Sequence, residues 1–68
     1  MDSYKLEYEL KTRGLTVRML CEELGISRSA YYRKTHGLSE FTLSEIQHIV
    51  DFLNLDSPMG IFFANRVS

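Results

Sequence analysis

The sequence has little of what stabilises very small proteins apart from a packed core. Its 68 residues include one cysteine, one proline and no tryptophan. The single cysteine, Cys21, excludes an internal disulfide, and Cys21, His36 and His48 lack the spacing of a zinc site. We therefore predict no metal and no cofactor, and we expect stability to come from regular helix packing or self-association.

Long apolar runs and catalytic motifs are also missing. No stretch of about 18 apolar residues occurs, which argues against a membrane partner, and the charged residues 1–10 do not resemble a signal peptide. We expect a cytoplasmic protein. The sequence shows no Ser/His/Asp set, phosphate-binding loop or paired-carboxylate pocket, so we predict no catalytic residues and no enzyme.

Charge is distributed unevenly although the formal net charge is only -1. Residues 11–35 hold six basic and two acidic side chains, whereas the rest of the chain holds two basic and seven acidic ones. Such a central basic segment favours local attraction of a polyanion. An ordinary solvated surface with chance clustering is the alternative interpretation.

The apolar residues repeat with a helical period, and glycines separate the successive helical segments. Val17, Leu20, Cys21 and Leu24 form one such stripe, which makes Cys21 a small buried residue. Thr16, Ser27 and Thr42 suit helix N-caps, and each follows an apolar residue that forms a hydrophobic staple. We predict an all-α single domain over residues 1–68, with five helices at about 4–13, 16–24, 27–35, 42–54 and 57–65.

The connection between the second and third predicted helices is very short. Leu24-Gly25-Ile26-Ser27 leaves room only for a sharp crossing, as in a helix-turn-helix. Together with Thr16, Leu20-Cys21 and Gly37, these residues resemble the pattern of phage repressors and Cro proteins, within the xenobiotic-response-element family of bacterial regulators. The resemblance implies a compact five-helix, lambda-repressor-like domain with the helix-turn-helix at about 16–35.

The helix at 27–35 is expected to lie in the major groove, with one face inward and one toward DNA. Ile26 and Tyr31 are assigned to the inward face, and the outward face is predicted to read bases through Arg28, Ser29, Tyr32 and Arg33. Predicted phosphate contacts are Thr16, Arg18, Lys34 and Thr42. The alternatives remain open that Tyr32 is a packing residue and that Arg18, Arg28 and Arg33 are solvated charges.

The sequence also departs from the family pattern at positions that contact the DNA backbone. Val17 stands where a Gln is frequent, and Leu38-Ser39-Glu40 is neutral to acidic where basic residues are common. These changes weaken the expected backbone contacts.

The C-terminal segment is rich in apolar residues. We predict a homodimer or partner surface from Ile61, Phe62 and Phe63 within a dimerisation tail at 57–66; the alternative is that both phenylalanines are core residues. The leading functional hypothesis is a sequence-specific DNA-binding regulator, phage- or prophage-encoded, acting as a repressor or Cro-like switch on double-stranded DNA. The second hypothesis is a protein-interaction modulator, anti-repressor or antitoxin, that uses the same fold to bind another regulator.

Overall fold

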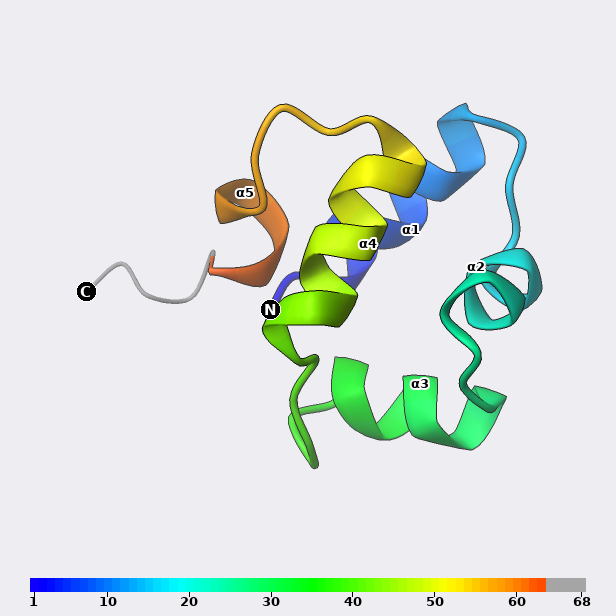
Figure 1. Ribbon diagram of the computed structural model, residues 1–68, viewed down its shortest axis with the longest axis vertical. Helices are drawn as coiled ribbons and strands as arrows, with labels where there is room; N and C mark the ends of the chain where they lie inside the picture. The colour runs from blue at the N-terminus through cyan, green and yellow to red at the C-terminus, as the bar shows by residue number, and fades with distance from the viewer. Residues whose placement is uncertain (64–68) are drawn as a thin grey trace.

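The computed structural model describes residues 1–63, and in that part of the chain all regular structure is helical. Its five helices confirm the predicted all-α class (Figure 1). Their bounds are α1 Ser3–Thr12, α2 Val17–Leu24, α3 Arg28–Thr35, α4 Leu43–Leu53 and α5 Met59–Phe62. The last helix is shorter than predicted, and residues 64–65 of its expected range, like residues 64–66 of the expected tail, lie outside the described residues.

The predicted N-caps form the starts of α2, α3 and α4. The hydroxyls of Thr16 and Ser27 accept hydrogen bonds from amides three residues ahead, at 3.1 and 3.0 Å. Thr42 and Glu45 form the complete capping box, with reciprocal bonds of 2.9 and 3.0 Å. These caps satisfy amides that no helical carbonyl reaches, so the chain itself marks where each helix begins.

One apolar core joins the helices. Its most deeply buried side chains come from α1, α2 and α4, and Tyr31 adds a contribution from α3. Cys21 is buried as predicted, and burial raises the pKa of its thiol. The fully buried set is Leu6, Leu10, Leu20, Ile49 and Leu53.

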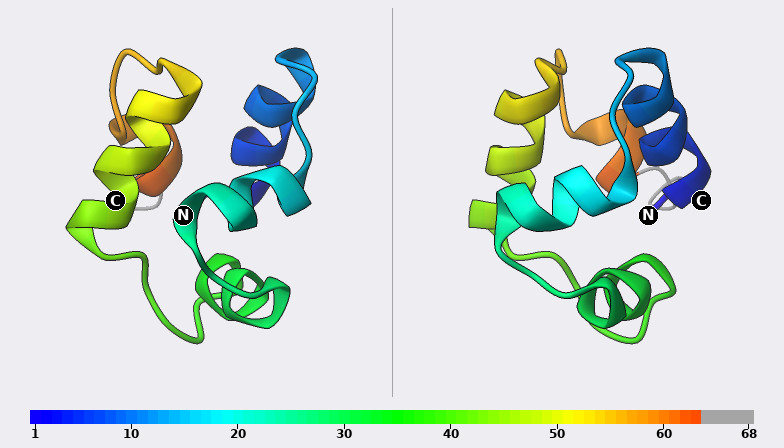
Figure 2. Two further views of the ribbon diagram at one scale, coloured as in Figure 1. Left: turned by 45° about the vertical axis from the view of Figure 1, so that its right-hand side comes forward. Right: turned by 90° about the vertical axis from the view of Figure 1, so that its right-hand side faces the viewer.

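The arrangement leaves α3 at one end of the molecule. Figure 1 shows α3 along the edge opposite the connection between α4 and α5. In both views of Figure 2 α3 again lies below the other helices, joined to them through α2 and the segment before α4. Because α3 is attached along one side only, its other side faces solvent.

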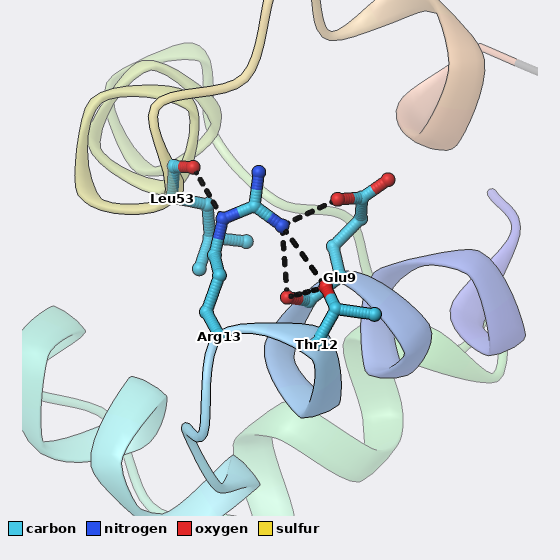
Figure 3. A network of polar contacts seen from close by, with 4 residues as sticks. All are labelled: Glu9, Thr12, Arg13 and Leu53. Carbon is cyan, nitrogen blue, oxygen red and sulfur yellow. Dashed lines mark hydrogen bonds and ion pairs between the residues drawn. The ribbon is translucent and has the colours of Figure 1, made fainter.

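Arg13 connects the ends of α1 and α4 (Figure 3). Its Nε donates to the Leu53 carbonyl at 2.7 Å, and one terminal nitrogen binds the Glu9 carboxylate at 2.5 Å and the Glu9 carbonyl at 2.9 Å. Glu9 and Arg13 are four residues apart, a spacing that favours such ion pairs on a helix. The bond to Leu53 spans 40 residues and could not be read from local spacing.

Candidate nucleic-acid interface

The turn between α2 and α3 is built around Gly25. This residue has φ 71° and ψ 31°, a left-handed conformation that is strained for residues with a Cβ. Its amide and that of Ile26 donate to the carbonyls of Glu22 and Cys21, at 3.3 and 3.0 Å, which closes the end of α2. Ser27 then caps α3, so only residues 25–27 separate the two helices. The predicted helix-turn-helix is thus present.

The two faces of α3 differ as predicted. Tyr31 is only 6% exposed and Ile26 packs partly buried against the core, so this face holds the helix in place. The four predicted base-reading residues are all exposed, and Tyr32 exposes 56% of its surface. The structure therefore brings together, on the solvent side of α3, the side chains of Arg28, Ser29, Tyr32 and Arg33.

The arginines on this face are not neutralised by neighbours. Among residues 1–63, no salt bridge involves Arg28 or Arg33. By contrast, Arg13 and Lys34 are both engaged by carboxylates. Two of the six basic side chains of residues 11–35 are thus held by contacts within the fold, whereas the outer face of α3 keeps two cations available for a ligand.

Lys34 lies in a different setting from the one that a phosphate contact requires. Its side chain is 14% exposed, and its Nζ binds the Glu45 carboxylate and the Glu40 carbonyl, both at 3.2 Å. Burial alone would raise the pKa of Glu45, but the bond from the Thr42 amide and the Lys34 ammonium hold this pKa below its ordinary value. Lys34 therefore joins α3 to the start of α4, and the phosphate role expected for it has no support in this geometry.

The other predicted phosphate contacts are exposed at helix starts. Thr16 caps α2, and its hydroxyl accepts one bond and keeps its own proton for donation. Arg18 forms only a loose pair with Glu22 at 3.5 Å, and 79% of its side chain is exposed. Thr42 is exposed too, but its amide already donates to the Glu45 carboxylate, so only its hydroxyl remains as a donor.

His36 was not among the predicted site residues, yet it contacts one of them. Its ring stacks on Tyr32 with centroids 3.9 Å apart and an interplanar angle of 22°. Its Nδ1 lies 2.9 Å from the Tyr32 carbonyl. The signal that could have revealed this contact is the spacing of four residues between two flat rings on a helix.

The tail differs from the expected partner surface. Ile61 and Phe62 are 3% and 9% exposed, and Phe62 packs edge-to-face on Phe41 with centroids 5.6 Å apart. Both belong to the core, and the Asp2 amide, which donates to the Ile61 carbonyl at 2.7 Å, joins α5 to the start of α1. Phe63 is half-buried and lines a groove with Leu43 and Ile46. Of the three residues, only Phe63 retains appreciable surface for a partner.

Within residues 1–63 no helix is long and apolar enough to cross a membrane. In the same part of the chain, no three His, Cys, Asp or Glu side chains gather as metal ligands.

Comparison with known proteins places this chain in a family. The family model described as Cro/C1-type HTH DNA-binding domain matches residues 5–58, which covers most of α1 and all of α2, α3 and α4. No curated protein matches the chain. No solved structure matches it either. With its helix-turn-helix formed and an exposed arginine face on α3, the chain belongs to the family of Cro/C1-type helix-turn-helix DNA-binding domains.

Proposed function

We propose that this protein is a sequence-specific regulator of transcription that binds double-stranded DNA through α3, as a repressor or a Cro-like switch. One observation carries the proposal. The outer face of α3 presents two arginines that no carboxylate of the described residues engages, beside an exposed serine and an exposed tyrosine. A helix held this way at one end of a domain fits the major groove.

Each outward side chain has a role that its chemistry suits. Arg28 and Arg33 donate in pairs to guanine O6 and N7, which is the commonest specific contact in such complexes. Ser29 donates to or accepts from a base edge. The Tyr32 ring contacts a thymine methyl group, while its hydroxyl reaches a phosphate.

Backbone contacts come from the start of α2. The amides of Val17 and Arg18 have no helical partner, the Thr16 hydroxyl lies beside them, and the Arg18 guanidinium is exposed. Free amides and a positive helix end favour a phosphate. Thr42 contributes its hydroxyl from the start of α4.

Selection of bound sequences from a random duplex pool tests the proposal and yields the operator. On the selected site, Arg28→Ala and Arg33→Ala are each expected to weaken binding by about 1–3 kcal/mol and to relax base preference at one position. Lys5→Ala is the matched control, because Lys5 is an exposed cation on α1 that lies beside Gly60 of α5, away from the proposed interface. If both arginine variants bind like the control, α3 does not read the bases.

We further propose that the protein acts as a homodimer, because one recognition helix covers only a short site. Phe63, Leu43 and Ile46 form the partly apolar groove that supports this proposal, and Leu43 is 80% exposed. Sedimentation at high micromolar concentration tests it, and a monomer under these conditions contradicts it.

A protein-interaction modulator is the second candidate. It is favoured by the exposed Leu38 and Leu43 on either side of the acidic Glu40, a surface unsuited to a phosphate backbone. Failure to retain any duplex at about 50 mM salt, where electrostatic binding is strong, would favour this candidate. Phe63→Ser would then be expected to reduce partner binding more than Arg28→Ala.

A further inference from the structure

The last turn of α3 holds Tyr32 against a second ring. His36 follows Tyr32 by one helical turn, and the two rings stack at 3.9 Å with an angle of 22° between their planes. Both residues are exposed, so the stacked pair stands on the solvent side of the helix instead of in the core. A packing role in the interior therefore does not explain it.

Hydrogen bonds fix the His36 ring in this position. Its Nδ1 lies 2.9 Å from the Tyr32 carbonyl and 3.2 Å from the Thr35 hydroxyl. A carbonyl oxygen only accepts, so the proton of this contact sits on Nδ1. The Thr35 hydroxyl in turn lies 3.0 and 3.1 Å from the Tyr31 and Tyr32 carbonyls. The imidazole is thus anchored to the backbone of the turn that carries Tyr32.

We propose that His36 is a positioning residue that orients the Tyr32 ring for base recognition and thereby sets the base preference at the position Tyr32 reads. The inference rests on the proposed function, since Tyr32 is one of the four side chains assigned to DNA. An exposed tyrosine ordinarily samples several rotamers, and ordering it on binding lowers affinity. Stacking on an anchored ring restricts that freedom before DNA arrives.

The chemistry of the pair predicts which property of His36 matters. The contact between the two ring faces stabilises the stacked arrangement, whereas the Nδ1 hydrogen bond only fixes the position of the His36 ring. Another flat ring at position 36 should therefore still orient Tyr32. A side chain that only donates a hydrogen bond should not.

The experiment measures binding of the full chain to the selected duplex and to single-base variants of it. His36→Ala and His36→Gln are expected to lower affinity about two- to tenfold and to reduce discrimination at one base pair. His36→Phe is expected to restore discrimination. His36→Ala combined with Tyr32→Ala should bind no more weakly than Tyr32→Ala alone, because the histidine acts through the tyrosine.

Two measurements separate this role from a structural one. The Tyr32 ring resonances of the free protein should shift in His36→Ala and His36→Gln, because both lose the imidazole ring current, while unfolding remains cooperative. His48→Ala is the control, since His48 lies on α4 and contacts Glu23 at 2.8 Å; it should leave discrimination unchanged.

The possible failures are distinguishable. If the parent chain retains no duplex, the proposed function fails. If the parent binds and Arg28→Ala weakens binding, but His36→Ala keeps full discrimination or adds its effect to that of Tyr32→Ala, the role of His36 is overturned while the function stands.

Discussion

Tyr31 is the residue through which α3 enters the core, and its hydroxyl is left without a partner. The ring is 6% exposed, and the hydroxyl oxygen has no hydrogen bond among the described residues. Burial first, and then the negative charge of Glu7, raise the pKa of Tyr31 above its ordinary value. The neighbouring Tyr32 has the opposite setting, exposed and stacked. Two adjacent tyrosines thus serve the core and the surface.

Removing the Tyr31 hydroxyl should not destabilise the protein. Tyr31→Phe keeps the ring and deletes a desolvated, unpaired group, so we expect an unchanged free energy of unfolding or a gain of up to about 1 kcal/mol in urea denaturation. Tyr32→Phe serves as the exposed control. A loss above about 1 kcal/mol for Tyr31→Phe would show that the hydroxyl has a partner, and the Glu7 carboxylate, whose charge raises the pKa of Tyr31, is the candidate.

Glu45 should make stability depend on pH. Since its pKa is lowered in the folded state, its contribution is complete above the ordinary glutamate pKa and is lost as the pH falls through the lowered value. Glu45→Gln preserves the capping box but not the charge paired with Lys34. We expect a loss of about 0.5–1 kcal/mol at neutral pH that disappears in acid. An equal effect of exposed Glu40→Gln would contradict the assignment.

At the level of elements, the crossing of α2 and α3 depends on a backbone conformation. Gly25 adopts φ 71°, and a Cβ built there would meet nothing within 4 Å. The position is therefore restricted by its dihedral angles and not by crowding. A larger side chain would fit the space but strain the turn that sets the direction of α3.

Gly25→Ala should consequently destabilise the domain by about 1–2 kcal/mol, the strain of a left-handed alanine. Gly60→Ala is the matched control, because Gly60 lies in α5 without a positive φ and its new Cβ would meet only the flexible end of Lys5 at 3.3 Å. Thermal unfolding of both variants tests the prediction. Equal melting temperatures would mean that the turn tolerates a side chain.

At the level of the whole molecule, some basic side chains hold helices together and others face solvent. Arg13 secures α1 to α4, and Lys34 secures α3 to α4. In the proposed interface the exposed cations are Arg18, Arg28 and Arg33, in a chain whose formal net charge is -1. Binding should therefore depend on local contacts and little on long-range attraction.

The salt dependence of DNA binding measures how many of these cations contact the DNA. With three cations of each protomer in the proposed interface, the slope of log K against log salt concentration should be no steeper than about -3 per protomer. Arg18→Ala should make the slope shallower by about 1 and weaken all sequences alike. A slope twice as steep would imply that Lys34 or further basic groups also reach phosphates.

The sequence by itself determined the helix starts, the inward and outward faces of α3 and the turn at Gly25. These features depend on side chains within about five residues of one another, through caps, staples and helical period. The family pattern follows from the same local residues, which is why the fold and the exposed face of α3 were predictable before the structure.

Tertiary structure alone decided which charges are available and which apolar residues of the tail are covered. Lys34 meets Glu45 across 11 residues, Arg13 meets Leu53 across 40, and Ile61 accepts from the Asp2 amide at the other end of the described chain. Local spacing says nothing about such partners, because they adjoin only after the helices pack. Lys34 and Ile61 thus belong to the fold, whereas Arg28 and Arg33 remain exposed.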